Sequence, residues 1–305
     1  MLKLQITPSL HSLLKKALEE DLGRRDITTA TFIPPHQRGE AVILAKESGI
    51  LAGGTVARQI FLLRDPSLRT RLHLKEGGRV KKGRKVLTVR GRVRSILEAE
   101  RVALNFLGHL SGIATSTRSY VDKIRGTNAK IFDTRKTTPL LRPLEKHAVR
   151  CGGGENHRFG LFDEILVKNN HWKAMGKILN ETRCRYFGQR LRPLLRRKKI
   201  PVEVEVKSLK ELAHLLEGSF VPDRILLDNF SVRELKRAVL FVKGLNEVLH
   251  THYGIHRKIP LLEASGGVAL GNVRSIARTG VDRISVGRLT HSAPALDFSL
   301  NLMNT

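Results

Sequence analysis

The sequence predicts an α/β protein whose larger part is a parallel βα barrel. After residue 114, six short apolar runs recur, and amphipathic stretches with helical spacing separate most of them. Strand and helix periods that alternate in this way indicate βα units with parallel strand pairing. The apolar runs are 129–132, 165–167, 202–206, 225–227, 260–262 and 284–286, and the clearest helical stretches are 208–216, 232–242 and 273–277.

Polar residues lie close to or just past the end of each apolar run. In a parallel barrel that end of the strands holds the active site, and the loops after the late strands commonly bind phosphate. An open doubly wound sheet would also gather polar groups at its carboxyl edge. The pattern therefore favours a barrel and leaves the open sheet as the alternative. The residues are Asp133, Lys168, Glu205, Asp228, Ser265 and Ser285.

The first 113 residues have a different pattern, which indicates a second domain. Apolar residues at helical spacing predict a helix over 11–21, and a second, longer helix is expected over 95–107. Between them, short strand-like runs at 39–44, 71–74 and 86–89 are separated by glycine turns.

Composition describes a globular chain of 305 residues, long enough for two domains. The longest uncharged run, 102–117, is too short and too polar to span a bilayer. The first residues lack the pattern of a signal peptide. Cys151 and Cys184 imply no disulfide framework and lack the paired spacing of a zinc site. We therefore expect a cytoplasmic protein.

The formal net charge of +27 is high for a metabolic enzyme. A basic surface can steer anionic substrates or bind nucleic acid. The segment 190–199 concentrates part of this charge, and we expect an exposed loop there rather than a nucleic-acid or phosphate patch. Its basic residues are Arg190, Arg192, Arg196, Arg197, Lys198 and Lys199.

Five basic residues lie among glycines and asparagines at the ends of apolar runs. Arginine matches carboxylate and phosphate oxygens with a planar fork, and lysine supplies a point charge. The arrangement favours a pocket for a small polyanion over a solvated basic face. These residues are Arg135, Lys136, His157, Arg158 and Lys168.

These residues belong to ordered strings that run through almost the whole chain. The strings resemble those of the quinolinate phosphoribosyltransferases, or nicotinate-nucleotide pyrophosphorylases (carboxylating). The central strings are Asp133-Thr134-Arg135-Lys136-Thr137, Gly152-Gly153-Gly154-Glu155-Asn156-His157-Arg158 and Lys168-Asn169-Asn170-His171. Further strings lie at 20–29, 100–107, 262–267 and 285–287.

The resemblance implies an N-terminal α/β sandwich joined to an incomplete six-stranded parallel βα barrel, with the last helix returning to the sandwich. We expect the sandwich at 1–113 with 290–305, and the barrel at 114–289. The implied reaction is phosphoribosyl transfer from phosphoribosyl pyrophosphate to quinolinate with decarboxylation. Its products are nicotinate mononucleotide, pyrophosphate and CO₂, in NAD biosynthesis.

The resemblance also implies roles for the basic residues. Arg135, Arg158 and Lys168 would clamp the two quinolinate carboxylates, with Thr134, Lys136 and His157 beside them. Arg101 would reach into the neighbouring subunit's site, which implies a homodimer or a higher homo-oligomer. The alternative for Arg101 is a surface ion pair with Glu98, three residues earlier.

Glu203 and Glu205 alternate with valines, so their side chains lie on the same face of a strand. The resemblance places Glu205 at the ribose and at Mg²⁺, with Asp228 as its partner, and the expected catalytic residues are Lys136, Glu205 and Asp228. An alternative for Asp228 is a helix N-cap. His157 and His171 lack a third metal ligand at suitable spacing. The expected phosphate-binding turns are Ser265-Gly266-Gly267 and Ser285-Val286-Gly287, which could also be plain turns.

The chain departs from the family pattern at three positions. Arg25 and Leu140 stand where glycine is usual, and Asn169 replaces a common acid. Leu140 and Asn169 are expected to alter loop shape and substrate preference. Three other functions remain open: the molybdenum-transport-associated paralogue, a phosphoribosyltransferase for a monocarboxylate such as nicotinate, and a nucleic-acid-binding protein on a retired enzyme scaffold.

Overall fold

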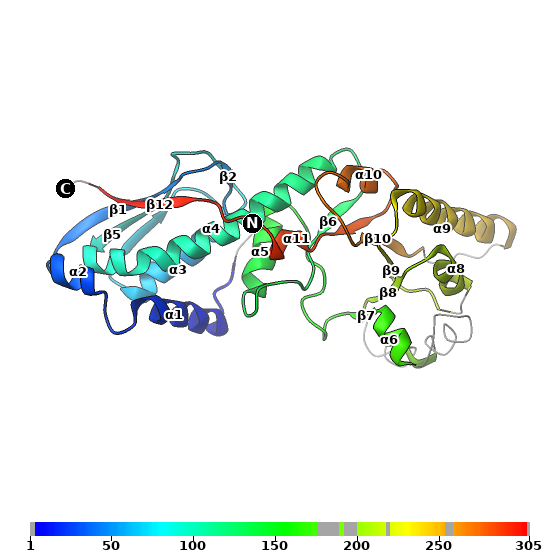
Figure 1. The fold of residues 1–305 in the computed structure, drawn as a ribbon, viewed down its shortest axis with the longest axis horizontal. Helices are drawn as coiled ribbons and strands as arrows, with labels where there is room; N and C mark the ends of the chain where they lie inside the picture. Colours follow the sequence, from blue (N-terminus) through cyan, green and yellow to red (C-terminus); the bar gives the residue numbers. More distant parts are fainter. Residues whose placement is uncertain (1–3, 176–188, 192–199, 218–219, 254–258, 304–305) are drawn as a thin grey trace. The chain divides into compact units, whose positions relative to one another are not determined.

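The computed structural model describes residues 4–175, 189–191, 200–217, 220–253 and 259–303. The chain divides into two compact units, drawn in Figure 1. The first unit comprises 1–118, 137–154 and 289–305, and the second comprises 119–136 and 155–288. The domain limits expected from the sequence stay a prediction. The units differ from them mainly by assigning 137–154 to the first unit.

The first unit is built on an antiparallel sheet of four strands in the order β12-β1-β5-β3. The C-terminal segment enters this sheet as strand β12, which pairs with β1 from Ala45↔Phe298 to Ala41↔Leu302. The last helix, α11, lies almost entirely in this unit, and the chain then ends in the sheet as strand β12. The bounds are β1 Arg38–Ala45, β3 Arg69–Leu72, β5 Lys85–Arg92 and β12 Phe298–Leu302, with a separate pair of β2 Gly49–Ile50 and β4 Arg79–Val80.

Helices accompany this sheet. Helix α1 (Pro8–Leu22) begins with proline at its first position, where a missing N–H costs nothing, and the Thr7 hydroxyl accepts the Leu10 N–H. Helix α4 lies so close to the C-terminal segment that a Cβ on Gly112 would come within 2.0 Å of the Pro294 carbonyl oxygen. The remaining helices with part or all of their length here are α2 Ile27–Phe32, α3 Gly54–Arg64, α4 Val93–Lys123, α5 Arg142–Gly152 and α11 Arg288–His291.

The second unit contains the predicted six-stranded parallel sheet, in the order β6-β11-β10-β9-β8-β7. From β7 to β11 each strand pairs with the next in sequence, and β11 pairs with β6. That order is the wrap-around order of a barrel, whereas a doubly wound sheet reverses at a switch point. In the described residues no pairing joins β6 to β7, so the barrel is incomplete, as expected. The strands are β6 Lys130–Phe132, β7 Ile165–Val167, β8 Val202–Val206, β9 Arg224–Asp228, β10 Leu261–Ser265 and β11 Arg283–Ser285.

Helices follow the strands of this sheet, as βα units require. Helices α8 and α9 pack against each other and follow neighbouring strands β8 and β9 (Figure 1). The bounds are α6 Asn169–Ala174, α8 Leu209–Glu217, α9 Val232–Tyr253 and α10 Val273–Ala277.

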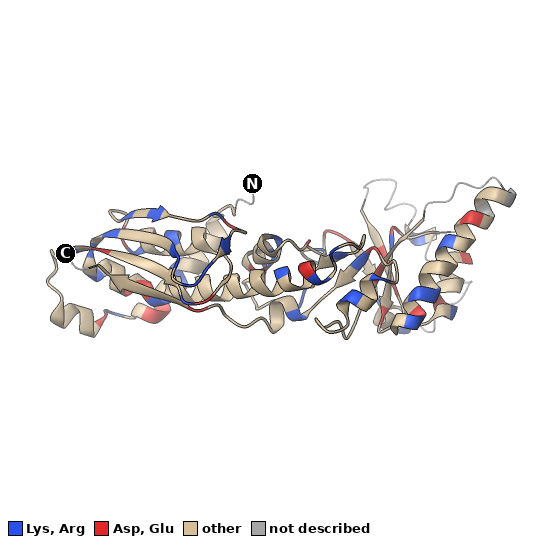
Figure 2. Cartoon of the chain, turned by 90° about the horizontal axis from the view of Figure 1, so that it is seen from above, with Lys and Arg blue, Asp and Glu red and all other residues tan. Residues whose placement is uncertain are grey.

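The basic residues occur on elements of both units, as Figure 2 shows. Most of the basic segment predicted to be an exposed loop, 192–199, lies outside the described residues. Among the residues that are described, no helix has both the length and the apolar character needed to cross a bilayer.

Candidate active site

The first two motifs of the sequence meet at the carboxyl end of β6. Asp133 follows this strand and is fully buried. Its carboxylate accepts hydrogen bonds from the His157 N–H (2.8 Å) and from Asn156 Nδ2 (2.6 Å). The Glu155 N–H donates to the Ile131 carbonyl oxygen at 2.8 Å. Because a buried carboxylate needs donors, Asp133 fixes the loop that carries Arg158 beside the loop that carries Arg135.

Arg135 and Arg158 bring two guanidinium groups close together. The pKa of Arg158 is lowered first by burial of its side chain and second by the positive charge of Arg135. Arg158 also donates to the Glu164 carbonyl oxygen at 3.2 Å. Two cations that repel each other in a sheltered position favour a bound anion, and each offers a planar fork for a carboxylate.

Two exposed lysines belong to the same edge of the sheet. The backbone N–H of Lys136 donates to Thr134 Oγ1 at 3.1 Å, which forms a tight turn directly after Asp133. Lys168 is the N-cap residue of α6, and its backbone N–H donates to His171 Nδ1 at 2.8 Å. Both local bonds fix the backbone and leave the two long side chains exposed.

Glu205 and Asp228 are half-buried near the carboxyl ends of the adjacent strands β8 and β9. Glu205 Oε1 accepts the Asn169 N–H at 3.0 Å, and Asp228 Oδ2 lies 3.8 Å from Lys207 Nζ. Hard carboxylate oxygens on neighbouring strands are suitable for Mg²⁺, which takes one or two such ligands together with substrate oxygens. The donor set therefore fits the expected ion.

The alternative role of Asp228 as a helix cap does not match the structure. Helix α9 begins at Val232, and Ser231 caps it. Ser231 Oγ accepts the Glu234 N–H at 3.3 Å, while Glu234 Oε2 accepts the Ser231 N–H at 2.8 Å. This reciprocal pair is a capping box, so Asp228 is not needed there.

The turn after β10 requires glycine. Gly266 and Gly267 have φ values of 91° and 60°, a region that side chains disfavour. A Cβ on Gly266 would lie 2.2 Å from Asn229 Oδ1. Residues 268–272 separate this turn from α10, which spans Val273–Ala277, the range predicted from the sequence.

The turn after β11 is the second expected phosphate-binding turn. Ser285 is buried, and the Val286 N–H donates to the Phe132 carbonyl oxygen at 2.9 Å. Gly287 directly precedes α11. The turns after β10 and β11 thus both lie at the edge where the lysines and carboxylates occur.

His157 is placed in the barrel interior between two buried carboxylates. Its Nε2 lies 3.1 Å from Glu203 Oε2 and 3.3 Å from Glu263 Oε1. Burial lowers the pKa of His157, but the hydrogen bonds to the two glutamates outweigh it and raise the pKa to about 9. The Arg158 N–H at Nδ1 (2.9 Å) opposes that rise, since it suits a neutral ring.

Arg224 and Arg283 complete this interior cluster. Arg224 Nε lies 3.6 Å from Glu203, and Arg283 Nε lies 2.6 Å from Glu263. The sequence pointed to Glu203 by its alternation with Glu205, but it gave no signal for Glu263 as a partner of His157. The contacts of His157 with Glu203 and Glu263 anchor the loop that also carries Arg158, the next residue in the sequence.

Arg101 is exposed on α4, in the first unit. Glu98, its alternative partner, forms an ion pair with Arg64. The role of Arg101 in a neighbouring subunit stays a prediction.

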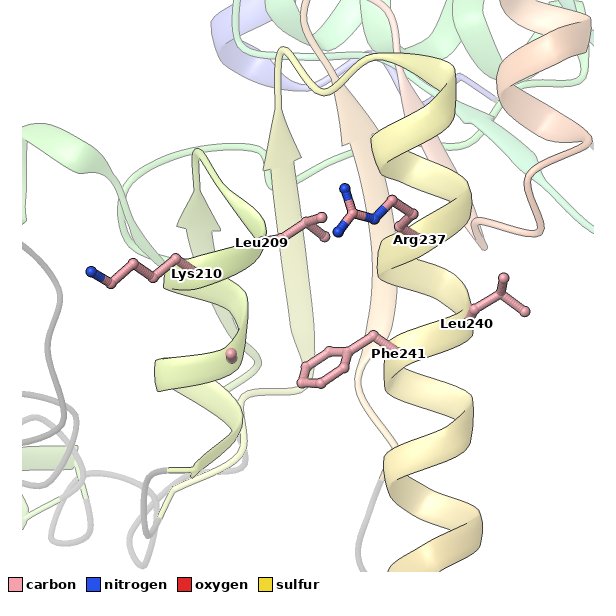
Figure 3. Close-up of a pocket in the computed structure, with 6 residues that line it drawn as sticks. Leu209, Lys210, Arg237, Leu240 and Phe241 are labelled. Atoms are coloured by element: carbon pink, nitrogen blue, oxygen red, sulfur yellow. The ribbon is translucent and has the colours of Figure 1, made fainter.

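A groove lies between α8 and α9 in the second unit (Figure 3). In Figure 3, Leu209, Arg237 and Phe241 point into the space between the two helices, whereas Lys210 and Leu240 point away from it. The lining contains none of the expected site residues. Its lining is Leu209, Lys210, Ala213, Arg237, Leu240 and Phe241.

Two family models match consecutive parts of the chain. Residues 26–111 match the N-terminal domain of quinolinate phosphoribosyl transferase, and residues 113–301 match its C-terminal domain. The chain belongs to the quinolinate phosphoribosyltransferase family.

Individual members of this family cover almost the whole chain. Nicotinate-nucleotide pyrophosphorylase [carboxylating] of Mycobacterium leprae is 40% identical, over 95% of each chain. Quinolinate phosphoribosyltransferase [decarboxylating] 1b of Nicotiana tabacum is 41% identical, over 97% of this chain and 83% of its own length. The structure of NadC from Streptococcus pyogenes aligns with a TM-score of 0.85 at 37% identity, over 99% of this chain and all of its own.

More distant structures share the fold alone. Human nicotinic acid phosphoribosyltransferase aligns with a TM-score of 0.59 at 12% identity, over 98% of this chain and 74% of its own length. The likeness to the quinolinate family therefore extends to sequence, and the likeness to the nicotinate enzyme does not.

Proposed function

We propose that the protein transfers the phosphoribosyl group of phosphoribosyl pyrophosphate to quinolinate, with loss of one carboxylate as CO₂. The observation that carries this proposal is the position of Arg135 near Arg158 at the carboxyl edge of the barrel sheet, where the charge of Arg135 lowers the pKa of Arg158. A pyridine with two carboxylates needs two such forks. The reaction belongs to NAD biosynthesis.

The basic residues bind and orient quinolinate. Arg135 and Arg158 hold the two carboxylates, with the exposed Lys168 and Lys136 as further cations. Thr134 supports Lys136, because its hydroxyl accepts the Lys136 N–H. The buried His157 positions Arg158, because its Nδ1 accepts the Arg158 N–H. Orientation of the ring nitrogen toward the ribose lowers the barrier by converting an encounter into a unimolecular step.

The acidic residues and the glycine turns serve phosphoribosyl pyrophosphate. Backbone N–H groups at Ser265-Gly266-Gly267 and Ser285-Val286-Gly287 bind phosphate oxygens. Glu205 and Asp228 face the positive charge that develops on the ribose as pyrophosphate leaves, an electrostatic form of catalysis. Glu205 and Asp228 would also hold Mg²⁺, which would supply positive charge to neutralise the departing pyrophosphate.

The bonds change in two stages. The quinolinate nitrogen attacks the anomeric carbon, and the bond to pyrophosphate breaks. The ring is then a pyridinium, which accepts the electron pair released when the bond to the 2-carboxylate breaks. A proton replaces CO₂ on the ring, and nicotinate mononucleotide leaves.

We further propose a homodimer or higher homo-oligomer in which Arg101 completes the partner's site. In each subunit, we propose that residues 1–113 and 290–305 form the sandwich domain and that residues 114–289 form the barrel domain. Cytoplasmic localisation stays a prediction, since plant relatives are named as chloroplastic or mitochondrial.

A turnover assay with three pyridine conditions tests the function. Quinolinate should support release of CO₂ and pyrophosphate, while nicotinate and the absence of a pyridine should not. Turnover of nicotinate instead would identify a monocarboxylate enzyme. Failure with both, under conditions where the protein is folded and Mg²⁺ is present, would favour the molybdenum-transport-associated function. Retention of nucleic acid in a gel shift at physiological salt would then support the nucleic-acid-binding alternative.

A further inference from the structure

We propose that Glu76, His147 and Cys151 form a binding site for a zinc-like transition metal ion in the first unit. This inference goes beyond phosphoribosyl transfer. Its donor set of sulfur, nitrogen and oxygen also differs in chemistry from the all-oxygen pair Glu205 and Asp228.

The three side chains come from two places in the sequence. His147 and Cys151 are four residues apart on α5, so they lie on the same face of this helix, one turn apart. Glu76 lies in the turn between β3 and β4. A pair of ligands at this spacing on a helix, with a third from elsewhere, is a common way to build a metal site.

Their ligand atoms form a triangle close to the size that a tetrahedral metal requires, with the side between Cys151 and Glu76 slightly long. Cys151 Sγ lies 3.4 Å from His147 Nε2 and 3.8 Å from Glu76 Oε2. His147 Nε2 and Glu76 Oε2 are 3.6 Å apart. Zn²⁺ bound tetrahedrally, at about 2.3 Å from sulfur and about 2.0–2.1 Å from nitrogen and oxygen, needs separations of about 3.3–3.6 Å.

Hydrogen bonds already hold the carboxylate in place. Glu76 Oε2 accepts the Gly53 N–H and Oε1 accepts the Thr55 N–H, each at 2.9 Å. Cys151 and His147 are buried. A ligand fixed by outer hydrogen bonds loses little conformational freedom when it binds a metal, which strengthens binding.

Cys151 forms no disulfide among the described residues and is buried, so its sulfur is available as a ligand. Metal binding forms the sulfur–metal bond and releases the thiol proton to solvent.

Titration of the untagged full-length protein with Co²⁺ alone tests the site. A thiolate bound to Co²⁺ gives a sulfur-to-metal charge-transfer band, which carboxylate-bound Co²⁺ at Glu205 and Asp228 does not give. We expect this band to saturate at one ion per chain, and we expect Zn²⁺ to displace it. Cys151→Ser should abolish the band, and His147→Asn should weaken Co²⁺ binding by more than about 100-fold, since loss of a direct ligand exceeds the effect of an outer hydrogen bond.

Cys184→Ser is the matched control, because it removes the other cysteine of the chain. The band should persist in this variant, and Zn²⁺ should raise the thermal midpoint of the wild type and of Cys184→Ser but not of Cys151→Ser. Absence of the band in folded wild-type protein would show that the three groups form only a hydrogen-bonded cluster. Its persistence in Cys151→Ser would assign it to another thiol. Either result would overturn the proposal.

Discussion

Gly266 lies so close to Asn229 that a Cβ atom on Gly266 would come within 2.2 Å of the side-chain oxygen of Asn229. Asn229 itself has a positive φ of 58°, and its backbone N–H donates to the Ser265 carbonyl oxygen at 2.8 Å. The ends of β9 and β10 are therefore locked to each other beside Asp228.

Gly266→Ala should displace Asn229 and the adjacent Asp228. We expect a loss of stability of about 2 kcal/mol or more from the clash and the strained φ together, and a large loss of kcat/KM. Chemical denaturation and steady-state kinetics measure the two effects.

Gly267→Ala is the matched control. Gly267 also has a positive φ, but a Cβ there would meet no atom within 4 Å. We expect only the backbone cost, about 1 kcal/mol. Equal effects of the two substitutions would show that the contact with Asn229 is unimportant.

Leu140 offers a test of backbone strain at a position where the family usually has glycine. It has a φ of 67°, and its side chain is 82% exposed. Leu140→Gly should relieve strain of about 1–2 kcal/mol, offset by about 0.5–1 kcal/mol of added freedom in the unfolded chain. The net expectation is a gain of up to about 1.5 kcal/mol in the free energy of unfolding.

Leu140→Ala separates the backbone from the side chain, because alanine keeps the Cβ. Its stability should stay within about 0.5 kcal/mol of the wild type. A gain as large as that of Leu140→Gly would place the effect in the exposed side chain instead.

His157 should make stability depend on pH. Its pKa is raised to about 9, so its bonds to Glu203 and Glu263 contribute fully below the unfolded pKa of about 6.5 and are lost as pH rises through about 9. Burial raises the pKa of Glu263, but the bond from His157 and the charge of Arg283 lower it to about 2, so this carboxylate stays ionised across that window.

The measurement is the difference in unfolding free energy between wild type and His157→Gln. It should be largest near pH 6 and shrink as pH approaches about 10. A difference that is constant with pH would show that His157 is neutral throughout, as the Arg158 N–H at Nδ1 favours.

The shared-site proposal predicts complementation between inactive subunits. Arg101→Ala and Lys168→Ala should each lose most activity. When the two proteins are mixed and exchange subunits, one hybrid site keeps both native residues, and part of the activity should return. Proven exchange without any recovery would rule out a contribution of Arg101 to the partner's site.

The barrel was predictable because its strands are short, apolar and end in polar residues. Each of the six predicted runs overlaps a strand of the sheet. Helix α5 was not predicted, since it buries Glu145, Lys146 and His147 together with its apolar residues Leu144, Ala148 and Cys151. The polar partners of these residues, such as His109 for Glu145 at 2.9 Å, come from distant elements.

The motif residues were selected by their resemblance to the strings of the family, and their roles stay a prediction. The contacts that hold them in place were not expected. Asp133 and Glu263 both contact His157, and no sequence pattern indicates that either residue would lie beside it. The same holds for the proposed metal site, since nothing in the sequence joins Glu76 to the helical pair His147 and Cys151. These residues become neighbours only in the folded chain, so local sequence patterns do not reveal their contacts.

The most direct test of the central claim is calorimetric titration of quinolinate and nicotinate into the wild type, Arg135→Ala and Arg158→Ala. The wild type should prefer quinolinate, and each substitution should weaken quinolinate binding by roughly 10- to 150-fold, the loss of one charge-assisted hydrogen bond of about 1.5–3 kcal/mol. Binding of phosphoribosyl pyrophosphate should change far less. Unchanged quinolinate affinity in both folded variants would contradict the assignment of this site.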